Sequence, residues 1–117
     1  MTFTQCDSGV NAMETKGRLI NCVITQCRYS GIFCGENALV ELEGHQTKVD
    51  GNVTSGNSGT YGLLTFDTSS IIHLLFPLTK ESVSTNNHNG QNYGSYGSNG
   101  ASIENTIKTV DSFEKTP

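Results

Sequence analysis

Charged residues are scarce in this sequence, at 15% of its 117 positions, and it contains no tryptophan and only two prolines, Pro77 and Pro117. Glycine, asparagine, serine and threonine are abundant instead. These residue types satisfy tight turns and disfavour helix interiors, so the composition argues against a helix-rich fold and predicts an all-β chain with many turns. A chain of this length builds one hydrophobic core, and we therefore treat residues 1–117 as a single domain.

Positive charge and long apolar runs are also rare. The seven basic residues, of which only Arg18 and Arg28 are arginines, are scattered along a chain with a formal net charge of −4. Nucleic-acid binding draws much of its affinity from neutralised phosphates, so we expect no nucleic-acid partner. The longest apolar candidate, residues 71–78, is interrupted by His73 and falls short of the ~20 residues that span a bilayer, so we expect no membrane segment.

The N-terminus and the cysteines carry little information on compartment. The opening residues, Met-Thr-Phe-Thr-Gln, lack the basic start and apolar run of a secretory signal, so the chain is either intracellular or part of a longer protein. The four cysteines, Cys6, Cys22, Cys27 and Cys34, fit neither a zinc-binding CxxC pair nor a familiar disulfide scaffold. We expect free buried thiols, no metal site and no cofactor.

Two internal repeats are visible. In the shorter one, Thr4-Gln5-Cys6 recurs as Thr25-Gln26-Cys27, and Ser8-Gly9-Val10 recurs as Ser30-Gly31-Ile32 after a one-residue insertion. The longer one relates Leu39-Val40 to Ile71-Ile72, Tyr61-Gly62 to Tyr93-Gly94 and Ser70-Ile71 to Ser102-Ile103. We assign the shorter repeat to the front of the chain and treat the extra length of later coils as loop insertions. The periods predict stacked coils of roughly residues 1–22, 23–46, 47–78 and 79–110.

Each predicted coil contains several short strands, such as residues 22–26, 31–34 and 39–43 of the second coil. Strands of this length gain stability only by stacking, so equivalent apolar residues should lie over one another in successive coils. The predicted columns are Cys6 over Cys27, Val10 over Ile32 over Leu63, and Ile20 over Leu42 over Leu74. An antiparallel β-sandwich is the alternative, because Asp50-Gly51 and Asn89-Gly90 fit the turns of β-hairpins.

The segment Val23-Ile24-Thr25-Gln26-Cys27, followed by Ser30-Gly31-Ile32 and echoed at residues 4–10, resembles the coils of right-handed parallel β-helix repeat proteins. Pectate lyases, alginate epimerases and many non-catalytic surface or interaction proteins share this superfold, and the resemblance covers most of residues 1–76. It implies an all-β, right-handed parallel β-helix of about four to five coils, but no particular substrate, because one superfold hosts many functions. Uncapped coil ends further imply a longer solenoid or a homo-oligomer.

Acid-base groups are sparse along the predicted coils. Asp7, Arg28 and Asp50 lie near equivalent coil positions, and His45 and His73 are available imidazoles. The resemblance implies that a lyase or epimerase would cluster several acids within one or two strands, and these residues form no such string. We therefore predict no catalytic residue, interpret these charges as solvated surface groups, and place His73 at a position matching Glu41 on an outward-facing strand.

Tyrosines are the better candidates for a ligand surface. Tyr61 and Tyr93 each precede a glycine at a matching coil position, and Tyr29 lies nearby in phase. A column of tyrosines would offer flat apolar rings with polar tips, which suits stacking on sugar rings. A tyrosine that packs over its own turn is the alternative interpretation of each.

Two C-terminal segments complete the prediction. Residues 86–100 are rich in Asn, Gly and Ser but lack the Lys-Ser/Thr and the helix of a phosphate loop, so we expect a long turn. In residues 103–113, apolar positions recur at intervals of three and four, which predicts a last strand or a short capping helix.

The sequence therefore predicts a non-catalytic β-helix module that binds a carbohydrate or a protein. The alternative is a fragment or relative of a polysaccharide lyase or epimerase. A face that gathers two or more carboxylates and a basic residue within reach of one ligand would favour the enzyme.

Overall fold

The computed structural model of the chain describes residues 2–57, 59–67, 69–96 and 103–113. Its strands form three four-stranded sheets in which every neighbouring pair is parallel. Sheet A contains β1 (Thr2–Thr4), β4 (Val23–Thr25), β7 (Lys48–Asp50) and β10 (Ser84–Thr85). Sheet B contains β2 (Val10–Met13), β5 (Ile32–Gly35), β8 (Leu63–Thr65) and β11 (Tyr93–Ser95). Sheet C contains β3 (Lys16–Ile20), β6 (Leu39–Glu43), β9 (Ile71–Leu75) and β12 (Ile107–Val110).

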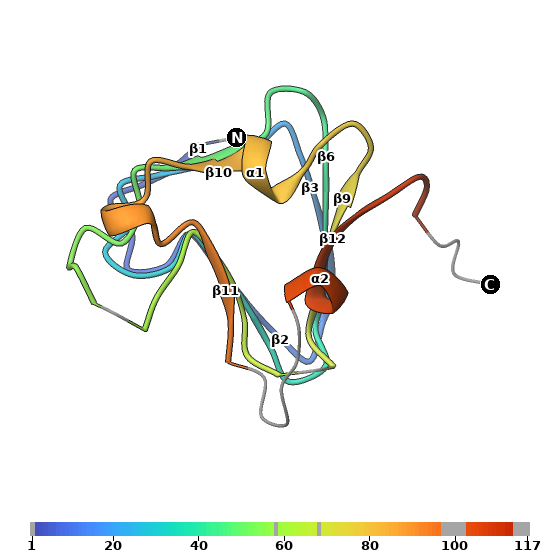
Figure 1. Ribbon diagram of the computed structural model, residues 1–117, viewed down its shortest axis with the longest axis horizontal. Helices are drawn as coiled ribbons and strands as arrows, with labels where there is room; N and C mark the ends of the chain where they lie inside the picture. Colours follow the sequence, from blue (N-terminus) through green and yellow to red (C-terminus); the bar gives the residue numbers. More distant parts are fainter. Residues whose placement is uncertain (1, 58, 68, 97–102, 114–117) are drawn as a thin grey trace.

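The chain is a parallel β-helix. It passes through sheets A, B and C in that order four times, and the three sheets form the sides of a triangular section (Figure 1). In that view the chain turns anticlockwise from β1 through β2 to β3 while later coils approach the viewer, which is a right-handed winding. The predicted fold class is confirmed, and the antiparallel sandwich is excluded because the paired strands come from successive coils and run in the same direction.

The predicted core columns are largely confirmed. Thr4 pairs with Thr25, so the two Thr-Gln-Cys triplets lie on one another, and the backbone N–H of Arg28 donates to the Cys6 carbonyl at 2.8 Å. Val10 pairs with Ile32, and Ile32 pairs with Leu63. The interior between the sheets is apolar and closed to solvent, with Ile24, Ile32, Leu42, Val49, Leu63, Ile72, Leu74 and Ile107 at most 1% exposed. Burial of each such side chain contributes ~1.5–3 kcal/mol, which accumulates coil by coil.

The prediction that Ile20 lies over Leu42 is wrong by one residue. Leu19 pairs with Leu42, whereas Ile20 pairs with Glu43 and is 55% exposed. The pairs Thr4–Thr25, Val10–Ile32 and Lys16–Leu39 show that the spacing between the first two coils grows from sheet A to sheet B and again to sheet C. One residue is added at each corner, and a strand shifted by one residue turns every side chain to the opposite face.

The corner between sheets A and B is a sharp bend held by buried amides. Gln5, Gln26, Gly51 and Asn86 occupy this bend in the four coils with φ of 57°, 58°, 67° and 55°. One residue later, the Asn52 side chain accepts from the Cys27 backbone N–H at 3.0 Å and donates to the Ile24 carbonyl at 3.1 Å. The Asn52 backbone N–H in turn donates to the Asn87 side-chain oxygen at 2.9 Å. These amides satisfy backbone groups that the bend removes from the sheets.

Insertions and short helices distinguish the later coils. The pairs Thr25–Asp50 and Ile32–Leu63 are spaced differently along the chain, and the wider spacing of the second shows that the 51–62 loop carries an insertion, as the sequence predicted for later coils. The helices are α1 (Lys80–Val83), the 3-10 turn η1 (His88–Gly90) and α2 (Ile103–Thr106). Residues 103–113 thus form a short helix and then the last strand. Residues 97–100 of the predicted long turn, and Ser102 of the longer repeat, lie outside the described residues.

Candidate binding surfaces

The three predicted tyrosines occupy three different coil positions. Tyr29 follows the bend of coil two, where its backbone bonds to Asp7 and Val53 of the neighbouring coils at 2.8 and 3.0 Å. Tyr61 precedes sheet B, and its backbone N–H donates to the Ser30 hydroxyl at 3.3 Å. Tyr93 pairs with Leu63 inside sheet B and packs against the core. The predicted tyrosine column is therefore wrong, because the corner of coil four is shorter than that of coil three and shifts Tyr93 inward.

Aromatic side chains do gather on the outer face of sheet B. Phe66 and Tyr96 follow β8 and β11 at the same coil position, each with its backbone N–H bonded at 2.9 Å to the coil below. Their ring centroids lie 6.1 Å apart with the rings at 85°, and the half-buried Phe33 ring lies 6.2 Å from that of Phe66. Phe66 is 47% exposed and Tyr96 46% exposed, so two rings on successive coils face solvent together.

Tyr61 joins this group from the adjoining loop. A Cβ added to Gly94 would lie 2.6 Å from the Tyr61 ring, so that ring covers the strand where a side chain is missing. The Tyr96 hydroxyl lies against Gly59 of the 51–62 loop. Partial burial, with a smaller contribution from Tyr61, raises the pKa of the Tyr96 hydroxyl above its ordinary value of 10.0. Phe33, Tyr61, Phe66 and Tyr96 together are called the aromatic face below.

A second surface is an open hollow, lined mainly by residues with polar side chains, at the corner between sheets A and B; it is called the corner groove below. It has a volume of about 660 Å³, and all four coils contribute to its lining, which consists of Gln5, Thr25, Gln26, Arg28, Asp50, Gly51, Thr54 and Asn86. The sequence singled out Asp7, Arg28 and Asp50 as near-equivalent positions. The structure brings the Arg28 guanidinium to 3.7 Å from the Asp7 carboxylate and 5.4 Å from the centre of the Tyr29 ring, and places Arg28 and Asp50 in the same groove.

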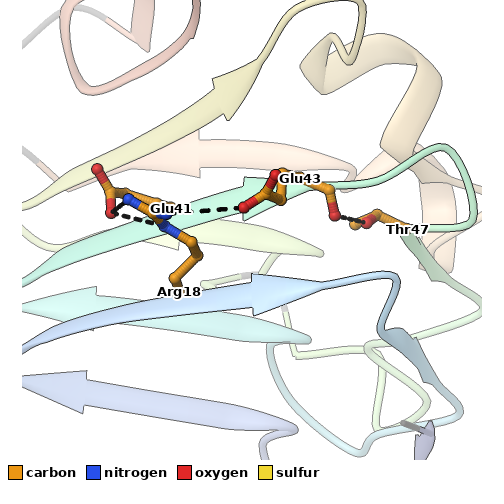
Figure 2. A network of polar contacts seen from close by, with 4 residues as sticks. All are labelled: Arg18, Glu41, Glu43 and Thr47. Atoms are coloured by element: carbon orange, nitrogen blue, oxygen red, sulfur yellow. Dashed lines mark hydrogen bonds and ion pairs between the residues drawn. The ribbon is translucent and has the colours of Figure 1, made fainter. Parts of the chain in front are cut away.

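A third cluster, on sheet C, contains two carboxylates and one basic residue, the number of groups that the sequence analysis set as favouring an enzyme (Figure 2). Arg18 donates through Nε and Nη2 to Glu41 Oε1 at 3.3 and 3.2 Å, and its Nη1 lies 3.8 Å from Glu43 Oε1. Glu41 is only 2% exposed, and the Phe113 ring packs 4.5 Å from the Arg18 guanidinium. The charges are paired with one another and Glu41 is closed to solvent, so this cluster is built as a structural ion-pair network.

His45 and His73, the imidazoles noted in the sequence, lie outside the aromatic face and the corner groove. His45 is exposed in the turn after β6, and His73 pairs in register with Glu41, as its sequence position indicated. Within the described ranges no three His, Cys, Asp or Glu side chains are grouped so as to hold a metal ion. No helix in the same ranges is long and apolar enough to cross a membrane.

No known relative supplies a function. Comparison with protein-family models, with curated proteins and with solved structures found no match. The geometry of the two surfaces is therefore the basis for a functional proposal.

The aromatic face and the amides at the corner were missed in the sequence. The spacing between Phe66 and Tyr96 matches neither repeat, and Phe33 lies two residues before the glycine at their coil position. Asn52 and Asn87 stand where coils one and two carry Cys6 and Cys27, so no repeated residue type marks that column. The signal that could have located the corner is the bend residue that precedes each of them, Gly51 or Asn86.

Proposed function

We propose that this chain is a non-catalytic carbohydrate-binding module that stacks sugar rings on the aromatic face. One observation carries the proposal, namely that Phe66 and Tyr96 hold a shared coil position with about half of each side chain exposed. A contiguous exposed apolar patch on a soluble domain commonly marks a binding surface. Sugar rings carry apolar C–H faces that pack on aromatic rings, while their hydroxyl groups bond to polar neighbours.

The surroundings of the rings suit a polyhydroxylated ligand. Tyr61 and Tyr96 add hydroxyl groups at the edge of the apolar area, and the 51–62 loop beside them is rich in Asn, Ser, Thr and Gly. This loop is anchored by Gln91, whose side-chain amide donates to the carbonyls of Asn57 and Thr60 at 2.9 and 2.6 Å. A site held in place before binding loses less conformational entropy when the ligand arrives.

The arrangement of charges supports a binding role over a lyase or epimerase. General acid-base catalysis needs a titratable group within hydrogen-bond reach of the substrate, with a pKa near the working pH. The Glu41 carboxylate of the ion-pair network is buried under Arg18 and lies on sheet C rather than beside the aromatic face of sheet B. Asp67 follows Phe66 in the chain, but hydrogen bonds from Ser70 and Ser69 lower its pKa, which makes it a weak base.

Affinity electrophoresis on gels that contain soluble polysaccharides tests the proposal, with xylan, β-glucan, galactomannan, pectate and alginate as probes. We expect at least one polymer to retard the protein, and Phe66→Ala and Tyr96→Ala each to weaken that retardation about 2-fold to 10-fold, since a stacked pair of rings contributes ~0.5–1.5 kcal/mol beyond area burial.

Ile20→Ala is the matched control, because Ile20 is an exposed apolar residue of sheet C at 55% exposure. Its retardation should equal that of the unmodified protein. If no polymer retards the protein, or if both aromatic variants migrate like the control, the aromatic face does not bind sugar.

A further inference from the structure

We infer that the corner groove is a second ligand site, which binds the neighbouring hydroxyl groups of an uncharged saccharide and rejects uronates. The inference rests on the proposed function for the class of ligand, a saccharide. It uses residues separate from the aromatic face, so each surface can be tested alone.

The hollow arises from one missing side chain. Gln5, Gln26, Gly51 and Asn86 repeat at the bend of the four coils, each with positive φ, and neighbouring strands of a sheet are ~4.8 Å apart. Three of the four positions therefore carry an amide side chain at the groove, and the third coil carries none. Gly51 leaves the gap between Gln26 and Asn86, with Asp50 beside it and Thr54 of the inserted loop at its edge.

The lining offers both hydrogen-bond donors and hydrogen-bond acceptors. Asp50 supplies a carboxylate that only accepts, Arg28 a guanidinium that only donates, and the amide and hydroxyl groups of Gln26, Thr25 and Asn86 do both. Each sugar hydroxyl donates one hydrogen bond and accepts others, so two adjacent hydroxyls can bond to an acceptor and a donor together. The volume of about 660 Å³ lies within the range of ~300–1,000 Å³ typical of small-ligand sites.

Charge selects against acidic sugars. Arg28 is the one cationic side chain among the described residues that line the groove, and the Asp7 carboxylate at 3.7 Å already balances it. Asp50 adds a negative charge in the groove, and the whole chain carries a formal net charge of −4. A uronate carboxylate that enters the groove meets like charge from this lining, whereas a neutral sugar has no charge to oppose.

Amide chemical shifts of the ¹⁵N-labelled protein test the inference. Neutral cello-, xylo- and malto-oligosaccharides are added to the protein in one set of titrations, and oligogalacturonate and oligoguluronate in a second set. We expect a neutral oligosaccharide to shift the amides of Gln26, Gly51 and Asn86 and the uronates to leave them unshifted. The shifts should persist in Tyr96→Ala, which alters only the aromatic face.

Gly51→Asn should abolish these shifts and weaken groove binding at least 10-fold, because it restores the missing side chain. Asn tolerates the left-handed conformation, as Asn86 does at the equivalent bend, so the backbone can keep its shape. Gly90→Asn is the matched control, since Gly90 also has positive φ, at 75°, and nothing lies within 4 Å of an added Cβ. If Gly51→Asn melts well below this control, Thr54→Ala is the second variant, and it should weaken groove binding without filling the bend.

Asp50→Asn separates hydrogen bonding from charge. We expect weaker binding of the neutral sugar, by about 3-fold to 10-fold, and loss of the discrimination against uronates.

Shifts confined to the aromatic face, a uronate that binds the groove better than neutral sugars, or wild-type affinity in both Gly51→Asn and Thr54→Ala would overturn the inference. If Gly51→Asn abolishes the groove shifts while no saccharide shifts the amides of Phe66 and Tyr96, the aromatic-face proposal fails and the groove stands; shifts at Phe66 and Tyr96 with none in the groove reject the groove alone. The absence of shifts at either surface with every saccharide rejects both.

Discussion

Single residues in the interior show how polar atoms are tolerated in so narrow a core. The Cys34 side chain is fully buried, and its thiol lies 3.2 Å from the Ala38 carbonyl and 3.4 Å from that of Ile71. The Thr65 hydroxyl donates to the Thr106 hydroxyl at 3.0 Å. In the described chain every buried side-chain nitrogen or oxygen has a partner, so the packed coils leave none of them unsatisfied.

The Cys34 thiol should make stability depend on alkaline pH. Burial raises its pKa from 9.0 to about 11, so between these values the folded protein keeps a proton that the unfolded chain releases. The free energy of unfolding should therefore be unaffected by this group below pH 9 and fall as pH rises to 11, by about 2–3 kcal/mol for a shift of this size. Urea titrations at pH 8, 9, 10 and 11 measure the decline.

Cys34→Ala provides the comparison for this pH series. The variant loses stability at every pH because of the cavity, but its decline between pH 9 and 11 should be shallower than that of the unmodified protein. Cys27 and Tyr96, whose pKa values are also raised by burial, contribute to the remaining slope in both proteins. Equal slopes would show that the Cys34 thiol does not titrate differently in the two states.

Asn52 should be among the polar residues whose substitution lowers the free energy of unfolding most. Asn52→Ala leaves the Cys27 N–H and the Ile24 carbonyl without their side-chain partners inside the corner. Each unsatisfied buried group costs ~1–3 kcal/mol, so for two groups we expect a loss of about 2–6 kcal/mol in the free energy of unfolding. Asn11→Ala, at an exposed position of β2, is the control and should change stability by less than ~0.5 kcal/mol. Chemical denaturation of the two variants decides the matter, and equal stabilities would contradict the structural role of the amide.

At the scale of elements, the three sheets are joined by corners whose shapes differ. The corner before sheet B repeats a glycine in coils one to three, at Gly9, Gly31 and Gly62. A Cβ at Gly31 would lie 2.5 Å from Val49 Cγ1 and 2.9 Å from the Gly62 carbonyl oxygen, and a Cβ at Gly9 would lie 2.8 Å from the Gly31 carbonyl oxygen. Glycine is required here because the backbone of the next coil occupies the space of a side chain.

Gly31→Ala should therefore destabilise the protein by about 2 kcal/mol or more, because the clashing atoms include backbone that cannot move without disturbing the next coil. Gly17→Ala is the matched control, since Gly17 lies in β3 with nothing within 4 Å of an added Cβ. Thermal unfolding followed by circular dichroism measures both. A Gly31→Ala variant as stable as Gly17→Ala would mean that the coils are less tightly stacked than the contacts indicate.

The same corners explain how far the sequence predicts the fold. Each Thr-Gln-Cys triplet contains the end of a strand and the bend that follows, so its recurrence locates a complete structural unit and predicts the stacking correctly. Ile20 was misplaced because the spacing between coils grows at every corner, and a repeat read at one corner does not carry to the next. The aromatic face was invisible because Phe66 and Tyr96 become neighbours only through loops of different length, which periodicity does not measure.

For the molecule as a whole, a solenoid is stabilised mainly by contacts between adjacent coils. The strands of coils two and three, β4 to β9, pair with strands on both sides, whereas β1, β2 and β3 of the first coil each pair with one neighbour. Four apolar residues of the first coil, Phe3, Cys6, Val10 and Leu19, are accordingly only partly buried. In such a linear array the free energy that protects a coil depends on its neighbours rather than on the whole structure.

Hydrogen exchange followed by mass spectrometry should reveal this gradient. We expect peptides that cover β4 to β9 to exchange slowest and peptides that cover β1 to β3 to exchange at least 10-fold faster, since opening the first coil breaks contacts on one side only. Repeating the measurement at several protein concentrations separates fraying from self-association: protection of β1 to β3 that rises with concentration means that a second copy pairs with the open edge. Uniform protection across all coils at the lowest concentration would contradict the picture of additive coil interfaces, because the domain would then open only as a single cooperative unit.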